Sequence, residues 1–180
     1  GLKTGDLHVA MELWETTARE AMDEAFATGD VVSMGETGMQ AIEEWWYPTY
    51  MEEKCPGLPD WTALQSCAEA FSTAETAPKG RFLGGPVDWL KHDAERVEAL
   101  GMNFEVVNAG SSAALWAELE SAVKRKEPIV LFNWTPNFVE ALYANDVGKL
   151  PDQNVAEAVR RLPGLSVAND QGEGRYVIIR

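Results

Sequence analysis

Hydrophobic residues recur at helical spacing near the start of the chain. Within residues 10–27, one face of a helix would carry Met11, Trp14, Ala18, Met22 and Ala25. This period, with polar residues between the apolar ones, predicts an amphipathic helix, and Gly29 supplies a stop signal just after it. Val31 and Val32 then indicate a short strand or an extended link.

The same period predicts four further helices. They cover residues 60–71, residues 88–100 and residues 112–126, and the fourth starts within residues 137–143. The expected N-caps are Asp60 and either Ser111 or Ser112. The inner faces of the first three helices would bury a set of apolar side chains: Trp61, Leu64, Ala68, Phe71, Trp89, Val97, Leu100, Leu115, Leu119, Ala122 and Val123.

Short apolar runs between these helices predict β-strands. They are residues 81–83, residues 104–107 and the continuous run 128–132, which is typical of a central strand covered on both faces. The aromatic stretch 45–50 follows neither period and is interpreted as a loop. Because strands alternate with helices, the sequence predicts an α/β fold with a largely parallel sheet flanked by helices.

The net charge of the chain limits the kinds of molecule that it is expected to bind. The formal net charge is −14, and residues 1–143 account for all of it, with 10 basic and 24 acidic residues. Nucleic acid and anionic membrane surfaces are poor partners for such a chain, whereas a cationic ligand is modestly favoured. Residues 144–180 hold five basic and five acidic residues, so the composition changes near residue 144.

Few residues point to catalysis or to metal binding. His8 and His92 have no metal-ligand partners nearby in sequence, and none of the common nucleotide-binding or nucleophile motifs occurs. We therefore expect no enzyme, no metal site and no cofactor. No apolar run approaches the roughly 20 residues of a membrane span, and the polar first residues do not resemble a signal peptide.

Tryptophan is the unusual component, because all seven Trp lie before residue 144. Trp61 and Trp116 are readily explained as core residues, but Trp14, Trp46 and Trp134 are not. Trp134 follows the run 128–132 at its carboxyl end, where parallel sheets bind ligands. A quaternary ammonium has no N–H to donate, and aromatic faces bind it through the ring quadrupole, each contact contributing roughly 0.5–2 kcal/mol.

Five separated motifs resemble the substrate-binding proteins of glycine betaine/proline/choline-type ABC transporters. They are Gly5-Asp6-Leu7-His8-Val9 through Glu12-Leu13-Trp14, Trp45-Trp46-Tyr47-Pro48-Thr49-Tyr50, Cys55-Pro56-Gly57-Leu58-Pro59-Asp60-Trp61, Lys79-Gly80-Arg81-Phe82-Leu83-Gly84-Gly85-Pro86 and Asn133-Trp134-Thr135-Pro136-Asn137. The resemblance covers residues 1–143. It implies a periplasmic solute-binding module for a methylated amine such as glycine betaine, choline or trimethylamine N-oxide, working with an ABC permease of the inner membrane.

In that family two lobes close on the ligand. The resemblance implies that residues 1–30 are a remnant of lobe 1 or of the hinge, and that residues 31–143 are the ligand-binding lobe 2. It implies a Trp box with Trp14 from lobe 1 and Trp134 from lobe 2. The third wall comes from Trp45, Trp46 or Tyr47, of which we favour Trp46.

Cys55 and Cys67 flank a turn and a predicted helix, and two free buried thiols are the alternative to a disulfide between them. The resemblance to secreted binding proteins favours the disulfide.

The last segment, residues 144–180, resembles the plug of a TonB-dependent outer-membrane receptor, so we expect a tail of different origin. A helix from Asp152 through Arg161 and a strand from Tyr176 to Ile179 are predicted there. The sequence therefore also allows an alternative hypothesis, in which the chain is a fused or incomplete fragment that binds no ligand. Such a fragment would serve as a structural domain and form a homodimer through its incomplete lobe-1 face.

Overall fold

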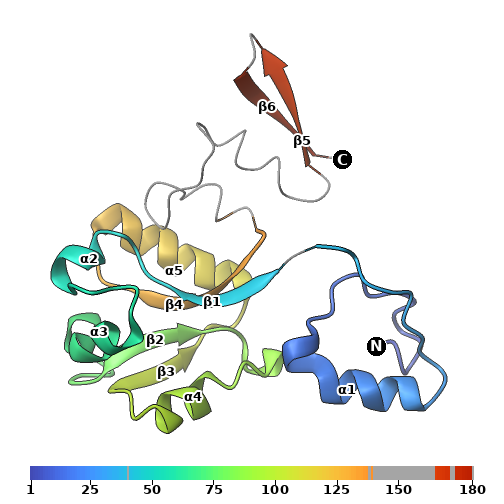
Figure 1. Cartoon of the computed structure of the whole chain (residues 1–180), viewed down its shortest axis with the longest axis horizontal. Coiled ribbons are helices and arrows are strands. Elements are labelled where there is room, and N and C mark those ends of the chain that lie inside the picture. The colour runs from blue at the N-terminus through green and yellow to red at the C-terminus, as the bar shows by residue number, and fades with distance from the viewer. Residues whose placement is uncertain (40, 138, 140–164, 171–172, 180) are drawn as a thin grey trace.

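The computed structural model describes residues 1–39, 41–137, 139, 165–170 and 173–179 (Figure 1). Its centre is a four-stranded sheet in the order β1-β4-β2-β3, formed by β1 (Ile42–Trp46), β2 (Gly80–Gly84), β3 (Phe104–Asn108) and β4 (Val130–Thr135). Strands β2, β3 and β4 run parallel, and β1 pairs antiparallel with β4. The predicted α/β class with a largely parallel sheet is confirmed.

Strand β1 corrects one sequence interpretation. The stretch interpreted as a loop contains Trp45 and Trp46, and both lie in a strand whose backbone pairs with β4 in regular register. The hydrophobic pattern of β1 is irregular because a charged residue, Glu43, is largely buried and forms an ion pair with Lys91. A strand with a carboxylate on its inner side does not show the alternation expected of strands.

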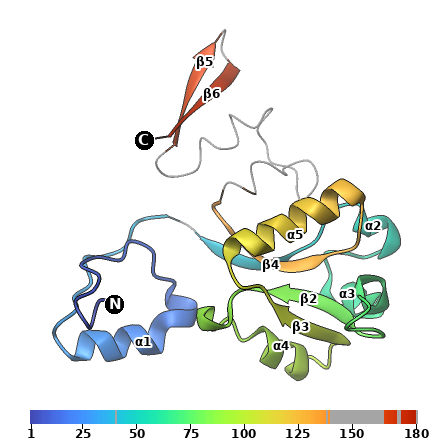
Figure 2. The same cartoon turned by 180° about the vertical axis from the view of Figure 1, so that it is seen from behind.

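Helices cover both faces of the sheet. Helix α5 (Ser112–Arg125) lies on one face, and α3 (Trp61–Ser66) and α4 (Asp93–Ala99) lie on the other (Figures 1 and 2). Two caps were predicted and are confirmed. The Ser111 hydroxyl accepts from the Ala114 backbone N–H at 3.2 Å, and the Asp60 carboxylate accepts from the Thr62 backbone N–H at 2.7 Å.

The predicted core is confirmed along α5 and corrected elsewhere. Leu115, Leu119, Ala122 and Val123 are buried against the sheet. Trp61 and Leu100, predicted as core residues, are 48% and 45% exposed. Both line a pocket between β1, α3 and α4, so part of their apolar surface stays open.

Two predicted helices are shorter than expected. The segment 60–71 divides into α3 and a 3-10 turn, η1 (Ala68–Phe71), and the segment 88–100 divides into a 3-10 turn, η2 (Val87–Trp89), and α4. Between η2 and α4, Leu90 and His92 have φ values of 52° and 56°. Left-handed residues cannot continue a right-handed helix, so the chain changes direction there.

A disulfide joins Cys55 to Cys67, with their Cα atoms 5.8 Å apart. Cys55 follows the short helix α2 (Met51–Lys54), and Cys67 ends α3. The predicted bond is confirmed, and it ties these two helices together beside the sheet.

The N-terminal arm, residues 1–39, contains helix α1 (Glu15–Ala27), which begins five residues later than predicted and ends before Gly29. It meets the rest of the structure near η2 (Figure 1), where the Lys91 ammonium donates to the Thr17 hydroxyl at 3.3 Å. The arm carries large hydrophobic residues that are each at least 47% exposed: Leu7, Val9, Met11, Leu13, Val32, Met34 and Met39.

The end of the chain forms a separate antiparallel hairpin of β5 (Leu165–Asp170) and β6 (Glu173–Ile179). The predicted strand Tyr176–Ile179 is confirmed as part of β6, whereas β5 was not predicted. The helix predicted from Asp152 through Arg161 lies outside the described residues. Among the helices that the structure describes, none combines the length and apolar character needed to cross a membrane.

Candidate ligand-binding site

Trp134 lies in a cluster of aromatic rings at the carboxyl end of β4. Its ring centroid is 5.4 Å from that of Trp89, 5.6 Å from that of Trp116 and 5.9 Å from that of Phe132. Trp89 and Phe132 also contact each other, with their centroids 6.0 Å apart. We call these four residues the aromatic cluster. Phe132 is buried in the core at 4% exposure, and the three tryptophans are partly buried and pack against that core.

Local features hold the cluster in place. Gly85, just after β2, passes directly under Trp89, and a Cβ atom there would lie 2.6 Å from the Trp89 ring. Only glycine allows this approach. At the end of β4, the Asn137 amide donates to the Asn133 side chain at 3.0 Å and also to the Trp134 carbonyl. The Asn137 side-chain oxygen accepts from the Val139 backbone at 2.9 Å, which fixes the turn after Trp134.

A lysine ammonium lies against this cluster. Lys91 Nζ is 5.3 Å from the Phe132 ring centroid and 5.8 Å from the Trp14 ring centroid. It forms an ion pair with Glu43, and both side chains are largely buried, with 12% and 17% exposed. Two aromatic rings therefore already hold a positive charge at this end of the sheet.

Trp14 reaches the same place from the N-terminal arm. It is half-buried, and its indole N–H donates to Glu12 at 2.8 Å. Its ring contacts Lys91, Lys91 contacts Phe132, and Phe132 contacts Trp134. Lys91 and Phe132, which the sequence did not indicate as site residues, therefore link Trp14 to Trp134 by successive contacts.

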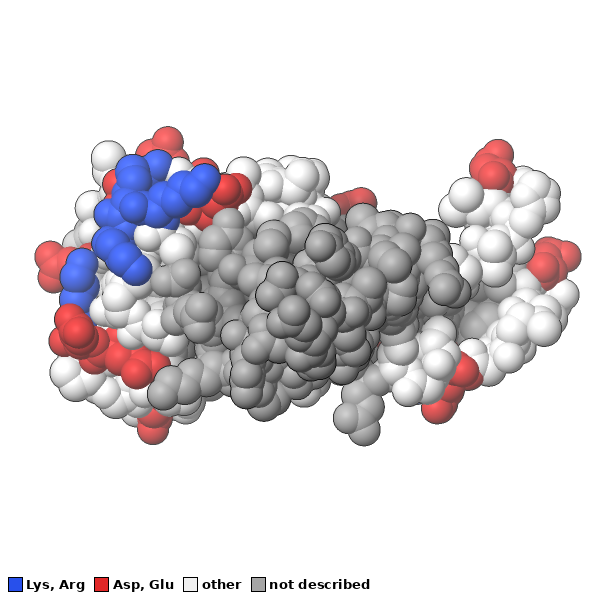
Figure 3. Space-filling model, turned by 90° about the horizontal axis from the view of Figure 1, so that it is seen from above, with Lys and Arg blue, Asp and Glu red and all other residues white. Residues whose placement is uncertain are grey.

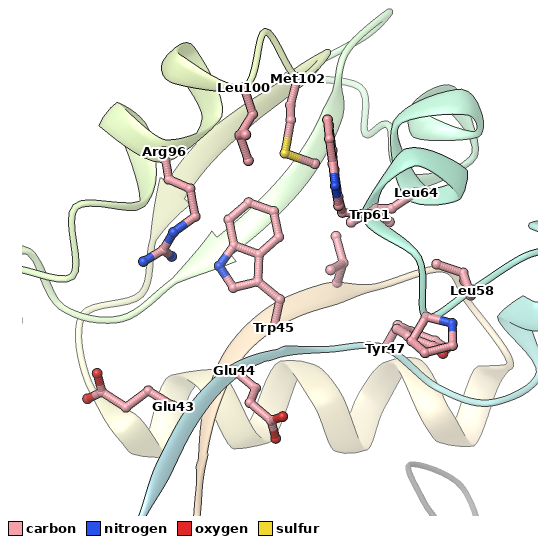
Figure 4. Close-up of a pocket in the computed structure, with 12 residues that line it drawn as sticks. Glu43, Glu44, Trp45, Tyr47, Leu58, Trp61, Leu64, Arg96, Leu100 and Met102 are labelled. Carbon is pink, nitrogen blue, oxygen red and sulfur yellow. The ribbon is translucent and has the colours of Figure 1, made fainter.

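Trp45 and Tyr47 lie in a different place, a pocket of about 320 Å³ between β1, α3 and α4 (Figure 4). The Trp45 ring stacks on Phe82 with centroids 3.8 Å apart, and Arg96 approaches it at 6.0 Å. Trp61, Leu100 and Met102 form the other side of the pocket. Glu43 borders this pocket and also binds Lys91, so it lies between the two sites.

Trp46 points away from both sites. In the β1–β4 ladder, Trp45 lies opposite Phe132, whereas Trp46 lies opposite Leu131. Because successive strand residues point to opposite faces, Trp46 is on the other side of the sheet from Trp45. The structure therefore links Trp14 to Trp134 through Lys91 and Phe132, places Trp45 on the same face of the sheet beside Phe132, and places Trp46 on the other face.

Asp93 and Arg96 form a second ion pair, in addition to that of Lys91 with Glu43. The Asp93 carboxylate, almost fully buried, accepts from the Trp45 indole N–H at 2.9 Å and pairs with Arg96 at 2.7 Å. Burial raises the pKa of Asp93 above its ordinary value. The Trp45 hydrogen bond and the charges of Arg96 and Lys91 partly offset that rise. These contacts anchor β1 to α4 beside the aromatic cluster.

The sequence did not indicate Lys91, Phe132 or Glu43 as neighbours of Trp134, and it predicted Trp89 as a core residue rather than as a neighbour of Trp134. Trp89 had the same signal as Trp134, because it closely follows the end of a parallel strand. Lys91 and Glu43 gave no local signal, since their pairing links segments 48 residues apart. The described residues contain no group of three or more His, Cys, Asp or Glu side chains arranged to hold a metal ion.

Comparison with known proteins identifies the fold and the family. The substrate-binding domain of the ABC-type glycine betaine transport system matches residues 1–161. The chain belongs to this family. The matched range runs past residue 143, near which the composition changes, and a separate origin for residues 144–180 stays a prediction.

Two relatives illustrate what the family contains. The chain is 40% identical over 148 residues to a trimethylamine N-oxide-binding protein of Pelagibacter ubique, which covers 77% of this chain and 46% of that protein. It resembles the crystal structure of a glycine/betaine/L-proline-binding protein from Borrelia burgdorferi, with a TM-score of 0.60 and 21% identity over 84% of this chain and 53% of the other. The chain thus spans about half the length of these relatives.

Proposed function

We propose that this member of the betaine-type family binds a small methylated amine, such as trimethylamine N-oxide, glycine betaine or choline, by cation–π contacts. The binding walls are Trp134 with Trp89 and Phe132 from the sheet side, and Trp14 from the arm. Of the candidates in the aromatic stretch, Trp45 is engaged with Phe82 and Asp93, and Trp46 faces the other side of the sheet. The third wall that the sequence predicted there stays a prediction.

One observation carries the proposal: the rings of Phe132, in β4, and of Trp14, in the arm, already hold a cation, the Lys91 ammonium. A site that stabilises one ammonium by ring faces offers the same chemistry to a methylated ammonium nearby. The position also fits, because open parallel sheets bind ligands at the carboxyl ends of their strands. The 40% identical relative, named for trimethylamine N-oxide binding, supports the same ligand class.

We further propose that the module works in the periplasm and delivers its ligand to an ABC permease. The Cys55–Cys67 disulfide supports this location, since such bonds persist in oxidising compartments. No residue of the aromatic cluster is arranged as a nucleophile or a general base, which fits a binding protein rather than an enzyme.

Calorimetric titration of the chain with trimethylamine N-oxide, glycine betaine, choline and carnitine tests the proposal. Saturable binding of at least one of these ligands is expected, and L-alanine, which has no methylated nitrogen, should give no saturable heat. If no methylated amine binds at millimolar concentration, a chain completed with the rest of lobe 1 should be titrated in the same way. Failure of both chains contradicts the proposal.

A second candidate function, a self-associating structural domain, is favoured by the exposed hydrophobic residues of the N-terminal arm. Met11 and Met34 are 80% and 90% exposed, and a second copy could cover them. Light scattering with and without ligand separates the two functions. A monomer that binds ligand supports the transport role, and a dimer that ignores every ligand supports the structural role.

A further inference from the structure

The pocket between β1, α3 and α4 lies toward the end of the sheet opposite to Trp134. Its lining includes Val130, the first residue of β4, and Met102, which comes two residues before β3. Trp134, by contrast, is the last residue but one of β4. Because β2, β3 and β4 run parallel, the pocket extends toward the amino ends of these strands, whereas Trp134 lies near their carboxyl ends.

The walls of this pocket are apolar and partly open. Its volume of about 320 Å³ is at the lower end of the range for small-molecule sites. Trp45 from β1 and Trp61 from α3 lie on opposite sides, and Leu100 and Met102 border the pocket from the segment that ends α4 (Figure 4). About half of the Trp61 and Leu100 side chains contacts water. An apolar ring in the pocket would remove this surface from water, and such burial favours binding.

Arg96 supplies a positive charge at the α4 side of the pocket (Figure 4). Its guanidinium pairs with the Asp93 carboxylate at 2.7 Å and lies 6.0 Å from the centroid of the Trp45 ring. The Trp45 indole N–H donates to the same carboxylate at 2.9 Å. The three side chains therefore hold one another in place, and the guanidinium is positioned beside the apolar wall.

The Arg96 guanidinium has donor capacity for a ligand. It carries five N–H donors in a planar fork, and among the described residues it donates from Nη1 to Asp93. The Asp93 side chain is 3% exposed and the Arg96 side chain 51%, so the positive member of the pair is the one that a ligand reaches. A guanidinium fork fits a carboxylate, which accepts two parallel N–H bonds.

Two glutamates also line the pocket, but neither opposes an anion beside Arg96. The Glu43 carboxylate is paired with the Lys91 ammonium. The Glu44 side chain points away from Trp45, because successive strand residues project to opposite faces of the sheet (Figure 4). The net charge of −14 acts over longer distances, and salt screens it beyond roughly 8 Å at physiological ionic strength.

We propose that this pocket is a second binding site, which takes a small carboxylate with an apolar ring. The ring lies between Trp45 and Trp61, and the carboxylate accepts hydrogen bonds from Arg96. The site stands independently of the proposed methylated-amine site, since it selects the opposite charge and uses other residues. The chain then carries two small-molecule sites of opposite charge preference toward the two ends of one sheet.

Calorimetric titration of the unchanged 180-residue chain with three probes gives the first test. Phenylacetate, which has both the ring and the charge, should bind saturably. Phenylacetamide keeps the ring and loses the charge, so it should bind about tenfold more weakly, the scale expected for a charged hydrogen bond. Acetate keeps the charge and loses the ring, and it should give no saturable heat. Equal affinity for phenylacetate and phenylacetamide, or no phenylacetate binding at millimolar concentration, overturns the proposal.

Two arginine variants locate the charge that the probe uses. Arg96→Gln should weaken phenylacetate about tenfold and remove its advantage over phenylacetamide. Arg81→Gln is the matched control, because Arg81 is also ion-paired, with Glu118 of α5 at 3.1 Å, on the other face of the sheet. It should leave both affinities unchanged. A preference for phenylacetate that survives in Arg96→Gln, or disappears in Arg81→Gln, contradicts the assignment of Arg96.

A tryptophan variant tests the wall and decides the case if Arg96→Gln, which leaves the buried Asp93 without its partner, fails to fold. Trp61→Ala should weaken phenylacetate and phenylacetamide alike, by about three- to tenfold, because it removes one ring face and no charge. Unchanged affinity in Trp61→Ala overturns the proposal. Saturating trimethylamine N-oxide should not displace phenylacetate; competition between the two would place phenylacetate at the aromatic cluster and overturn the second site.

Discussion

Glu43 on β1 lies directly opposite Trp134 on β4 in the antiparallel ladder, so a carboxylate lies beside a tryptophan near the carboxyl end of that strand. The carboxylate is satisfied by Lys91, whose ammonium also contacts Trp14 and Phe132. Four segments distant in sequence thus meet at one end of the sheet. The predictions below follow from this arrangement and from the elements that support it.

Trp134→Ala should weaken binding of trimethylamine N-oxide or glycine betaine. The substitution removes one aromatic wall and the apolar area that it covers, and we expect a loss of about 5- to 150-fold in affinity. Trp134→Phe should lose less, because a smaller ring remains. Isothermal titration calorimetry measures both. Unchanged affinity in Trp134→Ala would remove this residue from the site.

Trp61→Ala is the matched control for that experiment. Trp61 borders the pocket next to Trp45, outside the aromatic cluster, and is 48% exposed. Sequence reasoning predicted a core residue whose loss lowers stability. Because half of the side chain already contacts water, we now expect only a small change in the free energy of unfolding and no change in ligand affinity.

Asp93→Asn should change how stability depends on pH. Burial raises the pKa of Asp93 in the folded chain above its ordinary value of 3.8, so the unfolded chain loses this proton first as pH rises. Between the ordinary and the raised pKa, the folded chain binds more protons, and this group makes the free energy of unfolding fall as pH rises. The amide cannot ionise and removes that contribution.

Urea unfolding at several values between about pH 4 and pH 7, run on both chains, measures this effect. The difference in unfolding free energy, Asp93→Asn minus the unchanged chain, should increase with pH in this range. A difference that stays constant, or one that decreases, would show that ionisation of Asp93 is not disfavoured in the folded chain.

The Cys55–Cys67 disulfide should stabilise the folded chain. The bond closes a loop with a sequence separation of 12 residues, and loop entropy predicts about 2–3 kcal/mol for a loop of this length. The double variant Cys55→Ser/Cys67→Ser should lose about that free energy of unfolding. Intact mass after alkylation checks the bond itself, and two alkylated thiols in the native oxidised protein would disprove it.

Removal of the tail by cutting after Tyr143 should leave the sheet domain folded. In the described residues, β5 and β6 pair only with each other and add no strand to the four-stranded sheet. An isolated hairpin is marginally stable and contributes little to its neighbours. Thermal unfolding followed by circular dichroism should shift by only a few degrees. An unfolded product would mean that the sheet depends on residues after 143.

The sequence predicted those elements whose signal is local. Helix α5 shows a full period and a serine cap, and β4 is an unbroken apolar run, so both were found together with the position of Trp134 at the strand end. Strand β1 was missed because Glu43 points inward, and only its distant partner Lys91 makes that burial favourable. Trp61 was misplaced because periodicity identifies an apolar face without showing whether anything covers it.

The candidate ligand site was predictable only in part, because its residues come from distant segments of the chain. Two of the tryptophans that it joins, Trp14 and Trp134, stood out by their setting and by family resemblance. Strand register decides that Trp45 and Tyr47 line one pocket and that Trp46 lies on the opposite face of the sheet. No short sequence motif encodes that register.

Acidic side chains are also prominent on the surface. On the face drawn in Figure 3, basic side chains gather at one end, the end where α5 finishes with Lys124 and Arg125, whereas acidic ones are spread more widely. The far end of α5, near Trp116, is where the aromatic cluster lies. Lys124 and Arg125 therefore lie away from the aromatic cluster, and Lys91 is the basic side chain that lies against it.

Strand β1 borders β4 on one side, and in the described part of the chain no strand pairs with its other edge. Exposed strand edges invite pairing with a second chain and thereby aggregation. On β1 the Glu43 carboxylate is paired with Lys91, whereas the neighbouring Glu44 is exposed, and two copies aligned edge to edge would bring their Glu44 charges close together. The exposed Glu44, next to the candidate ligand site, therefore also discourages extension of the sheet from one molecule to the next.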